Sequence, residues 1–212
     1  WQYTDAVKGW VGFANLRFLD DKKQTGSVNF DPRVHKNFTT FWGSEIETKR
    51  IDASLKLGHV FPDLPYQSFG FQSAYSIHDQ NSYFGLRRYD VKHQSLFANL
   101  LFNSIITNTK NKFKTGINFS FDQYNEIVDK VDFERRDEVV GAFFEYSYDS
   151  LDKFSLTAGI RLDLHNRLGN FITPRLHMRY NPWERSVLRA SVGQGRKVAN
   201  IFAENQKLFG TN

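Results

Sequence analysis

Charged side chains recur at every second position near the C-terminal end of the chain, where they could hold or conduct a charged ligand. The set comprises Arg161, Asp163, His165, Arg175, His177, Arg179 and Arg189. Residues two apart share one face of a β-strand, so the spacing predicts one polar surface across three consecutive strands. Such a surface suits either a ladder of structural salt bridges or a transit path for an anionic substrate. We expect Asp163 and Arg175 to form an ion pair, because a short loop joins their strands.

A second group combines aromatic rings with two guanidinium groups inside the segment Asp79–Val91. Its members are Tyr83, Phe84, Arg87, Arg88 and Tyr89. Exposed rings can stack on flat ligands and arginines can bind carboxylates, so this segment is the first candidate for a ligand-binding loop. The alternative is a loop that packs on its neighbours. The segments Asp20–Glu45 and Asp122–Asp137 are the next candidate loops.

Other kinds of site find little support in the sequence. The chain has no cysteine, which excludes disulfides and zinc-thiolate sites. Its six histidines, among them His59, His78 and His165, form no H-x-H or H-x-x-x-H cluster, so we expect no metal site and no cofactor. Gly193-Gln194-Gly195 is followed by no predicted helix, which argues against nucleotide binding. A G-x-S-x-G nucleophile motif is absent, and we expect no catalytic residues and no enzyme activity.

The elements that carry these residues are predicted to be β-strands. In Phe154–His165 the apolar Leu156, Ile160 and Leu164 alternate with polar residues, a period typical of a strand and not of a helix. The same alternation predicts nine strands of about nine to fourteen residues, roughly the length that crosses a membrane at a tilt. The alternating residues that mark them lie within Trp10–Leu19, Ile51–Gly58, Phe69–Ile77, Ser95–Asn103, Phe113–Phe121, Val140–Tyr148, Phe154–His165, Arg175–Tyr180 and Leu188–Gly193.

The connections between these strands alternate in length. Short polar connections are Pro62–Pro65, Thr107–Asn111, Asp149–Lys153 and Asn181–Arg185. Between them lie the mostly longer connections Asp20–Glu45, Asp79–Val91, Asp122–Asp137 and Asn166–Asn170. Short turns at one rim and longer loops at the other are typical of an up-and-down outer-membrane β-barrel.

The two faces of the predicted strands differ in a way that fits a membrane. Aromatic residues gather near strand ends on the apolar face: Phe61, Phe69, Phe113, Phe121, Tyr146, Tyr148, Tyr180 and Trp183. Membrane barrels carry such aromatic girdles, and we expect the apolar face to point into lipid. The opposite face is too polar to be buried in a small soluble barrel, whereas a wide lumen can hold it. No run of 18 apolar residues predicts a transmembrane helix.

Composition excludes some further classes. Of the 212 residues, 16% are aromatic and 24% are charged, which argues against intrinsic disorder. The net charge of +5 is dispersed along the chain, whereas nucleic-acid-binding proteins concentrate basic charge in a patch. We therefore expect no nucleic-acid partner.

The stretch Ala158–Glu204 resembles TonB-dependent outer-membrane receptors. The resemblance is carried by Gly159-Ile160-Arg161-Leu162-Asp163, Thr173-Pro174-Arg175, Asn181-Pro182, Leu188-Arg189-Ala190-Ser191 with Gly193 and Gly195, and Glu204. One departure is that Lys197 follows Arg196 where an aromatic-Arg pair is common. The short connection Asn166–Asn170 is similar to that of receptors of the Bacteroidetes type.

The resemblance implies an antiparallel barrel of roughly 22 strands filled by an N-terminal plug, of which this chain would supply about nine strands. It implies energy-coupled uptake of a siderophore, haem, cobalamin or a glycan across the outer membrane of a Gram-negative bacterium. The implied partners are outer-membrane lipid, a TonB-type energy-coupling complex reached through the plug, an extracellular nutrient and a surface lipoprotein. We expect residues 1–212 to be a middle portion of the barrel, without the plug and the C-terminal strands.

Two other classes remain open on the sequence. An outer-membrane barrel enzyme, a lipase or a protease, would need a smaller closed barrel with its catalytic residues within hydrogen-bonding reach. A soluble β-sandwich that binds a ligand would bury the apolar face and would not need detergent.

Overall fold

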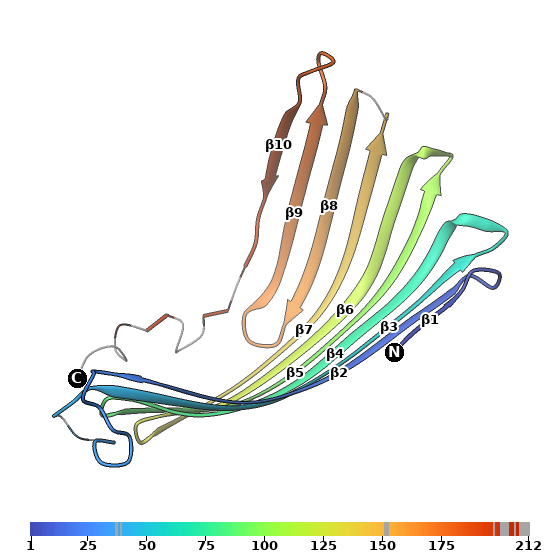
Figure 1. Cartoon of the computed structure of the whole chain (residues 1–212). Coiled ribbons are helices and arrows are strands. Elements are labelled where there is room, and N and C mark those ends of the chain that lie inside the picture. Colours follow the sequence, from blue (N-terminus) through green and yellow to red (C-terminus); the bar gives the residue numbers. More distant parts are fainter. Residues whose placement is uncertain are drawn as a thin grey trace.

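The computed structural model describes residues 1–36, 38, 40–150, 153–196, 198–199, 204–205 and 207. These residues form a single antiparallel sheet of ten strands, each paired with the next along the chain (Figure 1). The strands are β1 (Gln2–Asp5), β2 (Trp10–Gly26), β3 (Gly43–Phe61), β4 (Leu64–Phe84), β5 (Arg87–Ile106), β6 (Asn108–Val128), β7 (Val131–Asp149), β8 (Phe154–His165), β9 (Gly169–Tyr180) and β10 (Leu188–Gly193). The predicted all-β, up-and-down architecture is confirmed. The nine predicted strands correspond to β2–β10, and the short β1 is additional.

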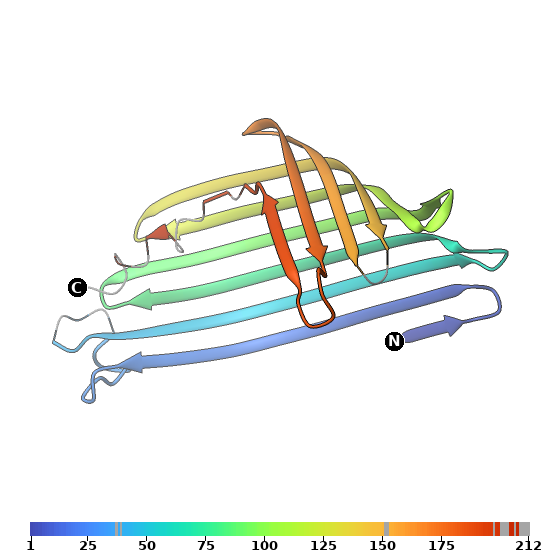
Figure 2. The same ribbon diagram turned by 90° about the horizontal axis from the view of Figure 1, so that it is seen from above.

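The sheet is strongly curved. Figures 1 and 2 show β1–β7 running side by side, while β8–β10 rise steeply from them and enclose a trough. Each edge strand, β1 or β10, has one neighbour in the described sheet. In the part of the chain that the structure describes, no helix is long and apolar enough to cross a membrane. Lys197 and residues 151 and 152 of the predicted Asp149–Lys153 turn lie outside the described residues.

The strand register joins the apolar positions of neighbouring strands into one continuous face. Ile160 of β8 lies opposite Phe144 of β7, and Leu162 lies opposite both Ala142 of β7 and Ile172 of β9. The same parity runs through every strand pair from β2 to β10. These side chains lie on the convex side of the sheet, where Ile160 is 52% exposed. A convex apolar surface with no protein covering it is the arrangement expected for contact with lipid.

The height of this apolar surface matches a bilayer. On β4 the convex residues from Phe69 to Ile77 bound a segment of nine residues. A tilted transmembrane β-strand needs about nine to eleven residues. Aromatic rings stack at its short-turn end, where the ring centroids of Phe102 and Phe144 each lie 6.0 Å from that of Phe113.

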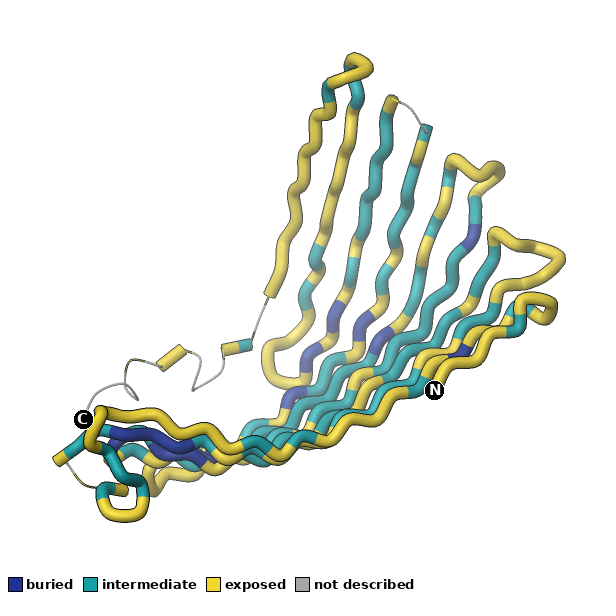
Figure 3. Tube along the Cα trace, viewed as in Figure 1, coloured by how far each residue is buried: buried dark blue, intermediate teal, exposed yellow. Residues whose placement is uncertain are grey.

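Two predicted loops are wrong, because the strands continue through them. In Asp79–Val91 only Gly85 and Leu86 lie outside strands, and in Asp122–Asp137 only Asp129 and Lys130 do. Strands β3–β7 are therefore 19 to 21 residues long and extend past the apolar band as hairpins. The buried apolar cluster of these extensions, built around Tyr89 and Val91, lies on the concave face, so the convex apolar pattern by which the membrane part was recognised does not continue into them. Figure 3 shows that buried positions gather in these hairpins.

The other two long connections are also shorter than predicted. Strands β2 and β3 extend into Asp20–Glu45 and leave residues 27–42 between them. Part of this loop packs over the strand ends, since the ring of Phe30 occupies the space beside Gly43. In Asn166–Asn170, residues 166–168 connect β8 to β9.

The two faces can be tested with one substitution on each face of β8. Replacing Ile160 by Arg in the full-length protein should cost about 2–4 kcal/mol of assembly free energy, because the guanidinium would lie in lipid. Replacing Thr157 by Arg, on the concave face, should cost much less. Heat-modifiable gel mobility of the membrane fraction measures the folded yield, and equal yields for both variants would refute the face assignment.

Candidate ligand-binding site

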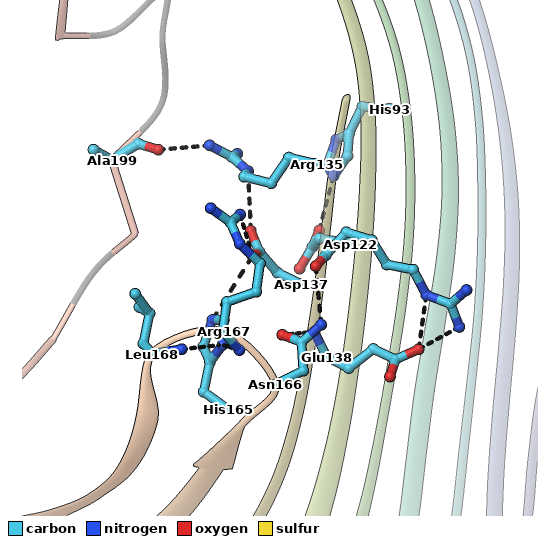
Figure 4. A network of polar contacts seen from close by, with 11 residues as sticks. His93, Asp122, Arg135, Asp137, Glu138, His165, Asn166, Arg167, Leu168 and Ala199 are labelled. Atoms are coloured by element: carbon cyan, nitrogen blue, oxygen red, sulfur yellow. Dashed lines mark hydrogen bonds and ion pairs between the residues drawn. The ribbon is translucent and has the colours of Figure 1, made fainter. Parts of the chain in front are cut away.

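A charged cluster occupies the concave face beyond the apolar band, where β6, β7 and β8 approach their far ends (Figure 4). Asp122 of β6 and Asp137 of β7 lie directly opposite each other in the register. Arg135 stands two residues before Asp137 on the same face, and His165 ends β8. Strand alternation therefore brings residues from separate parts of the chain to one wall.

Asp137 is the centre of the cluster. Its buried carboxylate accepts a hydrogen bond from Arg167 Nη1 at 2.9 Å and lies 3.0 Å from Arg135 Nε. Arg167 belongs to the β8–β9 connection, so its bond ties that connection to β7. The two guanidinium groups compensate the negative charge of this buried carboxylate. Replacing either arginine would leave the carboxylate with one positive partner fewer.

His165 also binds the β8–β9 connection. Its Nδ1 accepts a hydrogen bond from the backbone N–H of Arg167 at 3.1 Å. An accepting Nδ1 implies that the neutral ring carries its proton on Nε2, which lies 3.9 Å from Asp137 Oδ1. The imidazole is buried, so it fixes the turn and offers little surface to a ligand.

Next to this ion cluster, three side chains form a stack. The rings of His93 and Tyr124 are parallel within 7° and have centroids 4.0 Å apart. The guanidinium carbon of Arg135 lies 4.2 Å from the Tyr124 centroid on the same residue row. Asp122 orients the imidazole, since its Oδ1 is 2.8 Å from His93 Nε2. The wall thus carries flat, partly cationic groups in fixed positions.

A cavity of about 500 Å³ opens beside these groups. Its lining includes Asp122, Tyr124, Arg135, Asp137, Arg161, Asp163, His165, Phe171, Gln194, Arg196 and Val198. The segment after β10 borders it, because Arg135 Nη1 donates to the carbonyl oxygen of Ala199 at 2.7 Å. Arg196 lies over the ring of Phe171 at 5.0 Å and has no ion-pair partner among the described residues. The cavity therefore offers an unpaired cation next to an aromatic face.

The predicted polar residues do lie on one face of β8–β10, but they form two groups at different positions along the strands. Arg161, Asp163 and His165 border the cavity. Arg175, His177, Arg179 and Arg189 lie nearer the short-turn rim and form a separate group.

The predicted Asp163–Arg175 ion pair is wrong. In the register Asp163 faces Phe171, and Arg175 faces Gly159 four residues away. Asp163 instead pairs with Arg161 of its own strand, with Nη2 and Oδ1 2.7 Å apart. Arg175 reaches over β8 to Glu145 of β7.

The candidate loop residues occupy the β4–β5 hairpin and do not form one exposed surface. Tyr83 and Arg88 are opposite each other on the convex face, whereas Phe84 and Tyr89 lie on the concave face. The prediction that both tyrosines are exposed is wrong: Tyr83 is 5% and Tyr89 is 4% exposed. The two arginines are exposed and ion-paired, Arg87 with Asp129 at 3.2 Å and Arg88 with Asp90.

Tyr89 is held by a buried hydrogen bond. Its hydroxyl donates to Oε1 of Glu126 at 2.7 Å, and Glu126 is only 2% exposed. Burial, and then this hydrogen bond to a carboxylate, raise the pKa of Tyr89 above its usual value. The pair joins β5 to β6 in the hairpin extension, beyond the apolar band.

Several residues of the cluster were not found from the sequence. Asp122, Tyr124, Arg135 and Asp137 were assigned to a loop, and His93 was not singled out. A usable signal was the alternation Val131-Asp132-Phe133-Glu134 directly after Asp129-Lys130, which fits a strand that follows a two-residue hairpin turn. In the described ranges, no group of three or more His, Cys, Asp or Glu residues is arranged to hold a metal ion.

Comparison with known proteins assigns this architecture to a family. The family model described as "TonB dependent receptor-like, beta-barrel" matches residues 1–208. No curated protein matches the chain.

The Tyr89–Glu126 bond can be tested with a matched pair of substitutions. Replacing Tyr89 by Phe should lower the free energy of opening the β4–β5 hairpin extension, which this bond joins to β6, by about 1–3 kcal/mol, because Glu126 loses its donor in a buried site. Replacing Tyr83 by Phe is the control, since the Tyr83 hydroxyl has no hydrogen-bond partner among the described residues. Hydrogen exchange of the hairpin amides measures both, and equal effects would contradict the assigned role.

The same bond predicts a pH dependence. In the unfolded hairpin Tyr89 titrates near pH 10, and in the folded one its pKa is higher. The folded hairpin thus keeps its full stability below about pH 10 and loses it as the pH rises toward the folded pKa. Exchange rates should rise more steeply above pH 10 in the wild type than in the Tyr89→Phe variant. Identical pH profiles would rule this linkage out.

Proposed function

Because the chain belongs to the TonB-dependent receptor β-barrel family, we propose that it forms part of an outer-membrane receptor for energy-coupled uptake of a scarce nutrient. The observation that carries the proposal is the division of one sheet into two faces. The convex face of β2–β10 is a continuous apolar surface long enough to cross a membrane, and the concave face carries charged or polar side chains on every one of these strands. Family members are typically outer-membrane transporters of Gram-negative bacteria, and this division is what such a barrel wall needs.

The described sheet would be one part of a larger barrel. Its edges, β1 and β10, each leave one side for a further strand, and a barrel must close to satisfy its backbone in lipid. A plug inside the barrel would connect the receptor to a TonB-type complex. A surface lipoprotein is a further proposed partner at the end that carries the long hairpins.

We place the ligand contact at the cavity beside Arg135. The stack of His93, Tyr124 and Arg135 offers flat surfaces, and Arg196 offers an unpaired positive charge. These groups favour a nutrient with an anionic group and flat or apolar faces. Siderophores, haem, cobalamin and glycans are the candidate classes. The exposed Arg87 and Arg88 of the β4–β5 hairpin are candidates for the first contact.

Transport is favoured over catalysis by the surroundings of the His93–Asp122 pair. This pair, beside the cavity, resembles part of a catalytic triad. Among the described residues, no serine or threonine hydroxyl is hydrogen-bonded to His93, and its ring is stacked on Tyr124. The pair therefore orients a wall side chain, and we propose no enzyme activity.

The proposal is tested by uptake in a strain of the source bacterium that lacks the gene. Labelled ferric siderophore, haem, cobalamin and an oligosaccharide are supplied with and without a protonophore. The wild-type gene should restore protonophore-sensitive uptake of one of them. An Arg135→Ala variant should lower ligand affinity about tenfold, or about 1.4 kcal/mol, while Arg185→Ala at the short-turn rim should not. Restored uptake that is insensitive to the protonophore would contradict the proposal.

A further inference from the structure

A second cavity, of about 840 Å³, lies on the convex face, outside the trough that holds the proposed nutrient site. Its lining includes Glu47, Asn81 and Asp90, which are opposite one another across β3, β4 and β5 and share a face with Ile77. Lys36 of the β2–β3 connection covers one side of it. The volume is within the range of about 300–1,000 Å³ that is usual for small-ligand sites. This cavity is called the outer pocket below.

Tyr83 is the most deeply buried aromatic group of the outer pocket. It is only 5% exposed, and Lys36 Nζ lies 4.7 Å from the centre of its ring. Its hydroxyl is buried and has no hydrogen-bond partner among the described residues. A buried hydroxyl without a partner costs free energy, and it calls for a ligand or a water that completes its bonding. The outer pocket therefore contains a hydrogen-bonding group that its own walls leave unused.

The charged side chains that line the outer pocket balance one another. Four are cations and four are carboxylates, namely Lys36, Arg87, Arg88 and Lys130, and Glu45, Glu47, Asp90 and Asp129. The two arginines are neutralised by Asp129 and Asp90, and Lys36 shares Glu45 with Lys22. Lys130 forms no ion pair with any described residue. Such a balanced set of donors and acceptors suits a ligand with many hydroxyl groups, and it does not suit an acyl chain or a dense polyanion.

The position of the outer pocket along the strands restricts its occupant further. Asn81 and Tyr83 lie four and six residues beyond Ile77, at the end of the apolar band on β4. With about 3.3 Å per residue and a strand tilt of about 40°, the pocket lies about 10–15 Å beyond this band. The headgroup layer of one phospholipid leaflet is about 5–8 Å thick. A phospholipid headgroup therefore ends short of the pocket, whereas a lipid with an extended saccharide reaches it.

A row of alternating charges lies between the apolar band and the outer pocket. Asp20, Lys49, Asp79 and Lys92 are opposite one another across β2–β5. Lys92 Nζ is 3.9 Å from Asp79, and Lys49 forms no ion pair with any described residue. Ammonium groups at this level are placed to bind phosphate groups at the start of a lipid headgroup. The convex face thus passes from an apolar surface to lysines and then to a polar pocket, the order of parts in a lipid that carries phosphates and sugars.

We propose that the outer pocket binds the saccharide of a lipopolysaccharide molecule in the outer leaflet. Lys49 and Lys92 contact its phosphates, and its hydroxyl groups bond to Asn81 and Tyr83. A free glycan offers the same hydroxyl groups, but a pocket on the convex face has no route into the lumen. The occupant is therefore anchored in the membrane and is not the nutrient. The inference rests on the proposed function only in requiring an outer-membrane barrel whose long hairpins lie outside the cell.

The test is binding of lipopolysaccharide to the full-length receptor, purified in detergent and freed of bound lipid. Intact lipopolysaccharide of the source bacterium, its lipid A part and its saccharide part, separated by mild acid, are titrated and followed by native mass spectrometry. The intact molecule should bind at least tenfold more tightly than either part, because the pocket and the apolar surface act together. Equal affinity for lipid A would show that the saccharide makes no contact. Equal affinity for the free saccharide would identify a soluble glycan as the occupant, and either result would overturn the proposal.

Two double variants locate the contact. Lys36→Ala, Lys130→Ala should lower the affinity for intact lipopolysaccharide about tenfold and leave that for lipid A unchanged. Lys8→Ala, Lys153→Ala removes two exposed lysines at the short-turn rim and should change neither affinity. The single variant Lys130→Ala breaks no ion pair with a described residue, so it tests the pocket even where the double variant folds poorly, and about threefold weaker binding is expected. Unchanged binding of intact lipopolysaccharide by folded Lys130→Ala would refute the site.

Nutrient uptake separates this inference from the proposed function. Neither Lys36 nor Lys130 lines the nutrient cavity, so their double variant should take up the nutrient as the wild type does. Lost uptake with unchanged lipopolysaccharide binding would assign the outer pocket to the nutrient and overturn the inference. The binding titration needs no nutrient and no energy source, so failure of the wild-type gene to restore uptake would count against the proposed function alone.

Discussion

The unbroken backbone pairing of each strand with the next, from β1 through β10, is the constraint on which the rest of the structure depends. A strand in lipid finds no water for its N–H and C=O groups, so every interior strand must be bonded on both sides. When the pairing is unbroken, the alternation of side chains along each strand decides which of them contact lipid and which face the lumen. A register shift of one residue between two strands would exchange the two faces of the shifted strand. The two register shifts, at Val60/Phe61 and Ile105/Ile106, both lie beside the short turns. They leave the parity of the apolar surface unchanged.

Curvature adds contacts that flat pairing would not allow. On the concave face, side chains of every second strand converge, and a small residue on the strand between them leaves room for them to meet. A Cβ on Gly141 would collide with Asn118 of β6 and Asp163 of β8. A Cβ on Gly159 would lie 2.9 Å from Arg175 Nε, on the path by which Arg175 reaches Glu145. These glycines are needed for space, not for their backbone conformation.

This explains how far the sequence could be interpreted. Alternation in segments such as Phe154–His165 reports both strand and face, because one side meets lipid and the other water. In Asp122–Asp137 the apolar residues Val128, Val131 and Phe133 lie on the concave face, so the convex apolar pattern does not continue and the segment was taken for a loop. The shared face of the charged residues on β8–β10 was predictable from parity alone. Their heights and partners were not, since these depend on register and on contacts across an intervening strand.

The concave face differs in charge pairing between the part beyond the apolar band and the part near the short turns. The difference follows from where the carboxylates that pair with the cations lie in the sequence. Arg135 and Arg161 have an aspartate two residues away, so each pair forms as soon as its own strand does and needs no other element. The guanidinium of Arg135 can then also stack on Tyr124 without leaving Asp137 unpaired. A wall neutralised in this way keeps its geometry whether or not a ligand is present, which is the preorganisation that selective binding needs. Near the short turns, Arg179 and Arg189 have no carboxylate two residues away on their own described strands, and Arg175 pairs with Glu145 of another strand, so charge pairing there depends on the assembled sheet.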